Sequence, residues 1–431
     1  MRAAPLLLLT AFTLAACGET ATLSVDKGQG ANPELPAPKK TPLPTVKVAD
    51  ATGWPAGERP TAARGLKVTA FAAGLDHPRW LYVLPNGDVL VAESNAPPKP
   101  KDNKGIRGLV MGLVMKKAGA ATKSANRITL LRDADGDGHA EVRSTFLTGL
   151  MSPFGMALTN GRLYIANADA VVSVPYANGD LKASAAPVRL TDLPGGPINH
   201  HWTKSLMASK DGRFLYAGIG SNSNVGENGL NVEKDRAAIL EIDIATGQRK
   251  VFASGLRNPV GMDWNPATGE LWVAVNERDE IGSDLVPDYM TSVRRGGFYG
   301  WPWSYYGPHI DERVQPPNPD RVSKAIRPDY ALGPHTASLG LAFYTADALP
   351  QYKGGVFVGQ HGSWNRNPPS GYKVIFVPFN GDQPSGPPQD VLTGFLKDGK
   401  ARGRPVGVAV DAHGAILVAD DVGNIIWRVA K

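Results

Sequence analysis

Arginine, asparagine and histidine stand immediately before several apolar segments of this 431-residue chain. Arg257 and Asn258 lead into VGMDW, His201 precedes WTKSLMA, and Arg402 and Arg404 precede PVGVAV. Guanidinium groups bind carboxylates through paired hydrogen bonds, and a neutral imidazole accepts a proton near neutral pH. If the fold brings these side chains together, they would bind a small polyanion beside a general base.

Six similar segments of the chain supply these positions. Each has an apolar stretch, a turn rich in Asn, Asp or Gly, and a second apolar stretch, at residues 78–94, 153–169, 202–221, 258–277, 337–364 and 404–421. Such runs predict β-hairpins, and no long segment has a helical period. Six hairpins predict an all-β, six-bladed β-propeller with long inter-blade loops, closed by pairing of residues 66–72 with 424–430. The alternative is a β-sandwich, which needs fewer and more evenly linked strands.

A propeller would gather the residues at these strand mouths, because the inner strands of its blades begin around one end of a central channel. Further polar residues stand at the other strand mouths, at 199–201, 276–279, 361 and 364–366. A solvated loop is the simpler interpretation of any single arginine. Recurrence at equivalent places in several blades favours one basic, polar pocket rather than an apolar one.

Three segments resemble the glucose/sorbosone dehydrogenase family, and they are residues 200–223, 255–302 and 359–379. The resemblance covers about residues 65–431 and is greatest to the L-sorbosone dehydrogenase-like branch. It implies a six-bladed propeller that binds pyrroloquinoline quinone and calcium. Such an enzyme oxidises a hydroxyl, or a hydrated aldehyde, of a sugar or related polyol and passes the electrons to an external acceptor.

The resemblance also implies roles for individual residues. His201 matches the general base that takes the proton of the substrate hydroxyl. Arg257 and Asn258 match the pair at the quinone edge, where Arg257 would stabilise developing negative charge. Arg402 and Arg404, with Arg366 joining them, match arginines that hold the carboxylates of the cofactor.

The calcium-bearing loop of the family corresponds to residues 276–284. The expected ligands are the backbone carbonyls of Arg278 and Asp279 and the side chain of Glu277. The sequence departs from the soluble glucose dehydrogenases here, because they have Gly-Pro at 278–279. They also have a carboxylate where this chain has His200, so the residue that orients His201 is left open. Glucose is therefore not the predicted substrate.

A second cation site is expected apart from the resemblance. The segment RDADGDGHAE (132–141) places Asp133, Asp135 and Asp137 at alternate positions with glycines between them. Carboxylates at this spacing wrap a calcium ion in the first half of an EF-hand loop. The flanking sequence is not an EF-hand, so we expect a structural calcium in an inter-blade turn; a solvated acidic turn is the alternative.

The N-terminus indicates export and lipid attachment. Residues 1–16 combine one arginine, a short apolar run and small residues, which is typical of a signal peptide and too short to span a bilayer. The ending LAAC resembles a bacterial lipobox, so Cys17, the only cysteine, is the predicted attachment site. Residues 17–61 are rich in Pro and Gly and predict a flexible tether to a propeller domain over 62–431. The protein is expected at the cell envelope, anchored to the membrane.

The positive charge of the chain is local. Residues 96–127 contain eight Lys or Arg and one Asp, a net charge of +7 against +6 for the whole chain. The rest of the protein is therefore close to neutral, which argues against nucleic-acid binding. The apolar centre of this segment suits an anionic membrane or an electron-accepting partner, while a loop packed over the propeller is the simpler alternative.

Two other functions fit a six-bladed propeller. Calcium-dependent lactonases and phosphatases hold a metal-bound water with several carboxylates, whereas these strand mouths offer mainly Arg, Asn and His. A propeller that only binds a partner would not need a base beside clustered arginines.

Overall fold

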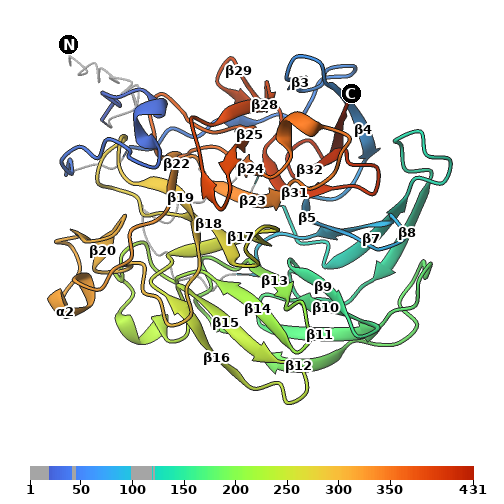
Figure 1. Cartoon of the computed structure of the whole chain (residues 1–431), viewed down its shortest axis with the longest axis horizontal. Coiled ribbons are helices and arrows are strands. Elements are labelled where there is room, and N and C mark those ends of the chain that lie inside the picture. The colour runs from blue at the N-terminus through green and yellow to red at the C-terminus, as the bar shows by residue number, and fades with distance from the viewer. Residues whose placement is uncertain (1–18, 41–44, 99–118, 120–121) are drawn as a thin grey trace, which may run out of the picture.

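Six antiparallel sheets, each built on four strands, make up the body of the protein. The computed structural model describes residues 19–40, 45–98, 119 and 122–431. The innermost strand of each sheet contacts that of the next sheet, and the last contacts the first, so that the sheets form a ring around one centre (Figure 1). The expected all-β, six-bladed β-propeller is thereby confirmed.

We number the blades in the order of their innermost strands, which come first in each set. Blade 1 consists of β5 (Pro78–Val83), β6 (Val89–Glu93), β7 (Arg127–Arg132) and β8 (Val142–Leu147). Blade 2 consists of β9 (Met156–Thr159), β10 (Arg162–Ala166), β11 (Ala170–Pro175) and β12 (Val188–Asp192). Blade 3 consists of β13 (Lys204–Ala208), β14 (Phe214–Ile219), β15 (Ala238–Asp243) and β16 (Arg249–Ser254).

The second half of the ring follows the same order. Blade 4 consists of β17 (Asn258–Trp264), β18 (Leu271–Asn276), β19 (Pro287–Ser292) and β22 (Tyr330–Pro334). Blade 5 consists of β23 (Ser338–Phe343), β24 (Val356–Gln360), β25 (Lys373–Val377) and β28 (Gln389–Thr393). Blade 6 consists of β31 (Pro405–Val410), β32 (Ile416–Asp420), β33 (Ile425–Ala430) and β4 (Lys67–Ala73).

Short elements occupy the connections. They are the strands β20 (Ser304–Tyr305), β21 (His309–Ile310), β26 (Phe379–Asn380), β27 (Gln383–Pro384), β29 (Leu396–Lys397) and β30 (Lys400–Ala401), and the helical turns η1 (Val25–Gly28), η2 (Leu230–Glu233), α2 (Pro319–Val322) and η3 (Pro350–Tyr352). Within the described ranges, none of the helices has the length and hydropathy that crossing a membrane requires.

The N-terminal and C-terminal parts of the propeller meet in blade 6. β4 pairs antiparallel with β33, from Lys67 opposite Ala430 to Ala73 opposite Ile425. This is the predicted pairing of residues 66–72 with 424–430. Closing the ring with strands from both ends leaves no open side between the first and last blades.

Glycine lets the inner strands approach one another at the channel. A Cβ on Gly261 of β17 would lie 2.3 Å from the carbonyl oxygen of Leu339 in β23, and one on Gly340 would lie 2.3 Å from that of Val406 in β31. Gly407 of β31 approaches Arg79 of β5 in the same way. Each of these glycines lies inside an inner strand, and their recurrence in blades 4, 5 and 6 reflects close backbone packing.

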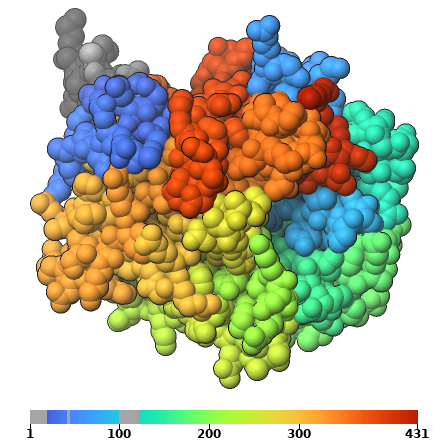
Figure 2. Space-filling view, viewed as in Figure 1, coloured from blue at the N-terminus to red at the C-terminus, as the bar shows by residue number. Residues whose placement is uncertain are grey.

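Residues 19–40 and 45–62, which we call the N-terminal segment, pack on the propeller, and this corrects the prediction of a flexible tether. Figure 2 shows the dark-blue beginning of this segment against the gold and orange-red parts of the chain. β1 (Gln29–Gly30) pairs with β22 at the edge of blade 4, β3 (Thr61–Ala62) pairs with β28 at the edge of blade 5, and β2 (Asp50–Ala51) pairs with β30. The composition of a segment indicates only whether it can form a hydrophobic core by itself. This segment instead pairs with the edge strands of blades 4 and 5.

A chain that begins at residue 62 should be less stable than one that begins at Glu19. Deletion would expose the edges of β22 and β28, and it would remove the Trp54 indole that donates to the buried Asp420 carboxylate at 2.7 Å. We expect the melting temperature to fall by roughly 5 °C or more. Calorimetry on the two proteins measures this, and equal melting temperatures would contradict a stabilising role for the segment.

Candidate functional site

The inner strands of the propeller begin at one end of the channel, which we call the mouth. β5 begins at Pro78 opposite Glu93 at the end of β6, and β17 begins at Asn258 opposite Asn276 at the end of β18. Polar residues stand just before the inner strands of five blades, and they are His77, His201, Arg257, His335 and Arg404. Because neighbouring inner strands run side by side in the same sense, these residues lie around the same end of the channel.

His201 lies in the loop before β13 and is held through one ring nitrogen. Its Nδ1 is 2.7 Å from the carbonyl oxygen of Ser221 and 3.1 Å from the Oγ of the same residue. Because a carbonyl oxygen only accepts, Nδ1 carries the hydrogen, and the neutral ring keeps its lone pair on Nε2. Burial and the positive charge of Arg257 hold the pKa of His201 well below its usual range. At neutral pH the imidazole is therefore an uncharged proton acceptor.

The structure distinguishes His201 from its neighbour His200. His200 is exposed, whereas His201 is partly buried and bonded to Ser221. The sequence left open which residue orients the His201 ring in place of the usual carboxylate. The carbonyl of Ser221, two residues after the end of β14, is that group.

The guanidinium of Arg257 is buried and fixed on one side by backbone and side-chain oxygens. Its Nη1 donates to the carbonyl of Glu277 at 2.6 Å, and its Nε and Nη2 donate to the carbonyl and the Oδ1 of Asn224 at 3.2 and 3.0 Å. Nη2 is also 3.5 Å from the Asp279 carboxylate. Arg257 is therefore a preorganised positive charge at the mouth.

His201 and Asn258 come together on either side of Gly220. A Cβ on Gly220 would lie 2.4 Å from the Cβ of His201 and 2.3 Å from the Oδ1 of Asn258, so only glycine fits between them. Among the described residues, the buried Oδ1 of Asn258 has no hydrogen-bond partner. The structure therefore brings together the residue matched to the base and one matched to the quinone edge, across blades 3 and 4.

The loop after β18 carries the expected calcium ligands. The Oε2 of Glu277 accepts from Arg278 Nε at 3.0 Å, while its buried Oε1 has no hydrogen-bond partner in the part of the chain that the structure describes. The Arg278 guanidinium donates to the carbonyls of Pro302 and Ser304 at 2.7 and 2.6 Å. Its side chain is thus engaged elsewhere, and the calcium role of its backbone carbonyl stays a prediction.

The backbone carbonyl of Asp279 is already used in this structure. It accepts from the Nδ2 of Asn224 at 3.1 Å and from the Nη1 of Arg313 at 2.9 Å. Calcium binding through this carbonyl, as predicted, would require one of these hydrogen bonds to break. The calcium role of Asp279 stays a prediction.

The carboxylate of Asp279 forms a cluster that was not predicted. It accepts from Asn365 Nδ2 and lies 3.4 Å from His335 Nδ1. Burial by itself would raise the pKa of Asp279, but the hydrogen bond from His335 and the charge of Arg257 lower it overall. Burial would lower the pKa of His335, and the hydrogen bond to Asp279 raises it overall. The pair therefore favours an imidazolium beside a carboxylate, next to Arg257.

A second cluster at the mouth surrounds Asp421, the residue after β32. Its Oδ2 accepts from Arg79 Nη1 and lies 2.9 Å from His361 Nε2 and 3.6 Å from His77 Nε2. Burial alone would raise the pKa of Asp421, but the neighbouring His361, His77 and Arg79 lower it far below its usual range. Burial lowers the pKa of His361 to about 4, although Asp421 opposes this shift. The guanidinium of Arg79 also lies over the ring of Trp202, 5.8 Å from its centre, beside His201.

Arg404 is one of three arginines predicted to hold cofactor carboxylates. It is 5% exposed, precedes β31 directly and lies over the ring of Tyr372, 5.3 Å from its centre. Its Nη2 donates to the Tyr372 hydroxyl at 3.3 Å, and within the described ranges its buried Nε has no partner. Arg404 therefore retains a donor for a ligand.

The other two arginines are bound to the N-terminal segment. Arg402 forms an ion pair with Glu58. Arg366 donates to the carbonyl of Leu23 at 2.9 Å and lies 3.4 Å from the carboxylate of Asp284. Arg366, Arg402 and Arg404 thus have different partners in the structure.

The acidic turn at 132–141 lies at the end of blade 1 that is opposite to the mouth. It joins β7 to β8 of blade 1, so it is an intra-blade turn at the opposite end of the strands and not the inter-blade turn expected. Single carboxylate oxygens of Asp133, Asp135, Asp137 and Glu141 lie within 4.8 Å of one another. They accept from backbone amides of the turn, such as Gly136 N at 2.7 Å. Calcium binding there stays a prediction, with Glu141 added to the predicted residues.

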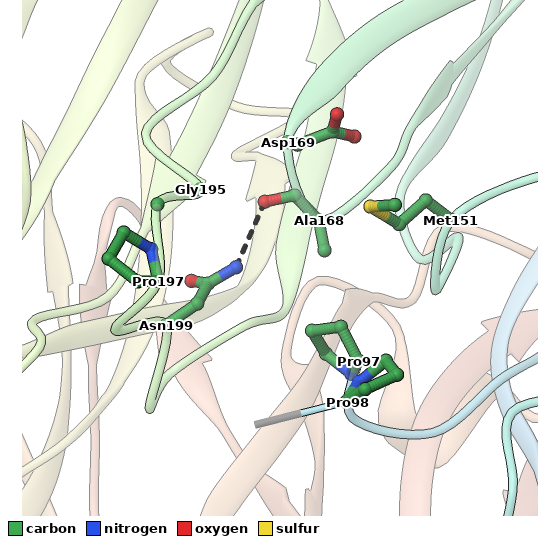
Figure 3. Close-up of a pocket in the computed structure, with 9 residues that line it drawn as sticks. Pro97, Pro98, Met151, Ala168, Asp169, Gly195, Pro197 and Asn199 are labelled. Carbon is green, nitrogen blue, oxygen red and sulfur yellow. Dashed lines mark hydrogen bonds between the residues drawn. The ribbon is translucent and has the colours of Figure 1, made fainter. Parts of the chain in front are cut away.

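A small pocket lies between connections of blades 1 and 2 and the loop that leads to His201. Figure 3 shows Asp169, Met151 and three prolines around it, with Asn199 on one side. The Nδ2 of Asn199 donates to the carbonyl of Ala168 at 3.1 Å. The wall of the pocket is therefore continuous with the loop that carries the candidate base.

Sequence reasoning did not single out several polar residues of the mouth, namely Arg79, Ser221, Asn224, His335 and Asp421. Three of them had the signal that identified Arg257, because Arg79, His335 and Asp421 stand at strand mouths in HPRWL, GPHTASLG and LVADD. Ser221 and Asn224 lie in the connection between β14 and β15. No pattern marks the residues of that connection as neighbours of His201 and Arg257. The remaining predicted residues, Cys17 and most of the basic segment 96–127, lie outside the described residues.

Comparisons with known proteins agree with this architecture. Residues 164–364 match the family model described as glucose/sorbosone dehydrogenase, and residues 318–431 match one described as TrAA12-like. An uncharacterized protein of Borreliella burgdorferi is 29% identical over 297 residues, which are 66% of this chain and 77% of that protein.

Two fungal proteins extend the comparison. The pyrroloquinoline quinone-dependent pyranose dehydrogenase of Coprinopsis cinerea is 25% identical, and the alignment covers 73% of this chain but only 44% of that enzyme. The holo form of its PQQ domain superposes with a TM-score of 0.70 at 20% identity, covering 89% of this chain and all of the domain. The calcium structure of a family AA12 protein of Trichoderma reesei gives 0.69 at 19% identity, covering 86% and 96%. At these identities the structural matches show a shared fold.

The sequence motifs at 200–223, 255–302 and 359–379, the six-bladed ring and the family match therefore agree. Residues 164–364 match the glucose/sorbosone dehydrogenase family model, and the chain is similar to this family.

Proposed function

We propose that this protein is a pyrroloquinoline quinone- and calcium-dependent oxidoreductase that oxidises a hydroxyl, or a hydrated aldehyde, of a sugar or related polyol. The match to the family model and the quinone dependence of the Coprinopsis relative support this proposal. The observation that carries it is His201, an uncharged imidazole with its lone pair on Nε2, packed through Gly220 against Asn258 and near the charge of Arg257.

The residues of the mouth fit a flat, polyanionic quinone. Buried donors and acceptors there have no partner among the described residues, and they include Asn258 Oδ1, Arg79 Nε and Arg404 Nε. An unpaired buried polar atom costs free energy that a ligand can recover. Arg404 would hold a carboxylate of the cofactor, and Arg257 with Asn258 would face its quinone edge.

One atom of the loop at 277–279, the Oε1 of Glu277, is suited to bind a hard cation. The Oε1 of Glu277 is a buried carboxylate oxygen that no donor satisfies in the described part of the chain. Oxygen ligands of this kind are those that calcium prefers. Glu277 with the backbone of Arg278 would hold the ion, and the calcium structure of the Trichoderma reesei protein supports the choice of metal.

When bound, the quinone supplies the two-electron acceptor of the oxidation. His201 takes the proton of the substrate hydroxyl at Nε2, and the Ser221 carbonyl keeps Nδ1 protonated throughout. The guanidinium of Arg257, held by Asn224 and Glu277, stabilises negative charge at the mouth without having to reorganise. An L-sorbosone-like substrate and an external electron acceptor belong to the same proposal.

The test is reconstitution of the protein with the quinone and calcium in the presence of a sugar and an artificial electron acceptor. Dye reduction that requires both the quinone and calcium is the expected result. Hydrolysis of a lactone with calcium alone would instead identify a propeller hydrolase. Absence of quinone binding by calorimetry would contradict the proposed cofactor whatever the substrate.

We also propose that Cys17 anchors the protein by lipid at the cell envelope, on the basis of the LAAC motif. Replacing Cys17 with Ser should move the exported protein from the membrane fraction to the soluble fraction, because lipid chains supply the membrane affinity. Fractionation of cells that produce each form measures this. If the variant still sediments with membranes, the basic segment 96–127 rather than a lipid holds it there.

A further inference from the structure

Lys204 is buried directly against the loop that carries His201. It is the first residue of β13 and is fully inaccessible to solvent. Its Nζ donates to three oxygens, the Oδ1 of Asn199 and the carbonyls of His201 and Trp202, each at 3.2 Å. An ammonium group has three N–H donors, so the three acceptors use all of them.

A second buried cation binds the same loop. The Nη2 of Arg236 donates to the Oδ1 of Asn199 at 2.9 Å and to the carbonyl of His201 at 3.3 Å. Its Nε donates to the carbonyl of Gly220 at 2.9 Å. Gly220 is the residue that packs against the Cβ of His201. The main chain of His201 and the surface against which its side chain packs are therefore fixed by the same pair of cations.

Placing two cations together in the interior is unfavourable. Burial and the charge of Arg236 lower the pKa of Lys204 well below its usual range, and burial lowers the pKa of Arg236 to about 10. An apolar side chain of similar length would fill the position of Lys204 without the desolvation cost. What the lysine adds is a set of three donors to residues 199–202.

The loop is also fixed at its other end. Asn199 accepts from both cations through Oδ1, while its Nδ2 donates to the carbonyl of Ala168 beside the pocket of Figure 3. Rotation of the His201 ring is limited by Ser221. Position and rotation of the imidazole thus depend on different groups.

We propose that Lys204 is a positioning residue for His201, an inference that rests on the function proposed above. By fixing the carbonyls of residues 201 and 202, Lys204 determines where the imidazole stands at the mouth. Misplacing a catalytic group by about 1 Å can cost on the order of 10²-fold in rate.

The test compares Lys204→Met with the wild type. We expect kcat per folded molecule to fall about 10- to 100-fold, while the quinone affinity measured by calorimetry stays within about twofold. The matched control is Lys210→Met, which changes an exposed lysine in the turn of the same hairpin and should leave both quantities unchanged.

A second readout separates positioning from loss of folded protein. The charged groups that face His201 are Arg257, Arg236 and Asp279, and burial is the larger cause of its lowered pKa. If the ring leaves its buried position in Lys204→Met, its pKa should rise towards the ordinary value. The acidic limb of kcat/KM would then move to higher pH, whereas a smaller folded fraction would leave that limb in place.

The same shift can be measured without the cofactor, by NMR titration of histidine-labelled apo-protein with the His201 signal assigned from His201→Gln. If Lys204→Met does not fold, Lys204→Gln, which keeps two N–H donors, should show a smaller shift in the same direction. An unchanged His201 titration and an unchanged kcat would overturn the proposal. If the wild type binds no quinone but the His201 pKa still shifts in Lys204→Met, the proposed function would be contradicted and the positioning role would stand.

Discussion

Replacing His201 with glutamine is expected to remove most turnover, lowering kcat by about 10²–10⁴-fold. Glutamine has similar volume and can donate to the Ser221 carbonyl that now accepts from Nδ1, but it cannot take up the proton of the substrate hydroxyl. Quinone affinity should be unchanged, because Arg257, Asn258 and Arg404 remain in place. Steady-state kinetics with a dye acceptor and calorimetry with the quinone measure the two quantities.

The pH dependence gives an independent check on this role. Burial and the charge of Arg257 hold the pKa of His201 well below the ordinary 6.5. The wild type should therefore keep its activity as the pH falls past 6.5 and lose it only when the pH passes the lowered pKa, where the lone pair of Nε2 is protonated. The residual activity of His201→Gln should lack this acidic limb.

His200 provides the control, because it is adjacent and has the same side chain. It is exposed, whereas His201 is partly buried and bonded to Ser221. His200→Gln should therefore retain turnover. Loss of turnover in His200→Gln together with an active His201→Gln would show that the base is the other histidine.

The architecture could be predicted because the sequence repeats its pattern. Each hairpin has the alternation and the turn residues of paired strands. Six such hairpins in one chain predict a six-bladed propeller. Glycines in the inner strands of blades 4, 5 and 6 add a second constraint, since the inner strand at Gly340 lies too close to Val406 for any side chain. Local pattern and global packing agree here, so the prediction required no knowledge of long-range contacts.

The N-terminal segment shows where such a prediction fails. Its Pro and Gly content describes a chain that cannot form a core of its own. Its structure depends instead on the free edges of β22 and β28 and on Asp420, which Trp54 reaches across the sequence. The composition of the N-terminal segment gives no information about these binding partners, because they belong to other parts of the chain.

The candidate site was predictable to the extent that it follows the strand mouths. His201, Arg257 and Asn258 were found by that rule. His201 and Asn258 lie together around Gly220, and Arg257 directly precedes Asn258. Ser221 and Asn224 orient them from a connection without periodic pattern. Hydrogen bonds from such a loop depend on its path in three dimensions, which spacing along the chain does not encode.

The arginines of blades 5 and 6 illustrate the same limit. The resemblance implied that Arg366, Arg402 and Arg404 act on one ligand, because they match arginines that hold the carboxylates of the cofactor in the family. Arg366 and Arg402 are bound to Leu23 and Glu58 of the N-terminal segment. These partners of the two arginines lie in a segment that was predicted to be a flexible tether. The sequence therefore could not distinguish the surroundings of Arg366 and Arg402 from those of Arg404.

This difference leads to a prediction that distinguishes Arg404 from Arg402. Arg404→Ala should weaken quinone binding by about 2–5 kcal/mol, because a cofactor carboxylate at the mouth would lose its charged partner. That is roughly a 30- to several-thousand-fold increase in Kd, measurable by calorimetry. Arg404 is suited to this role since its buried Nε has no partner within the described ranges, and Tyr372 holds its guanidinium.

Arg402→Ala is the matched control, two residues away in the same loop. Its guanidinium is paired with Glu58, so its loss should change quinone affinity by less than about threefold and show mainly as weaker attachment of the N-terminal segment. If Arg402→Ala greatly weakened quinone binding and Arg404→Ala did not, the proposed role of Arg404 would be contradicted. This result would mean that the ion pair with Glu58 opens when the cofactor binds and that Arg402 takes the carboxylate.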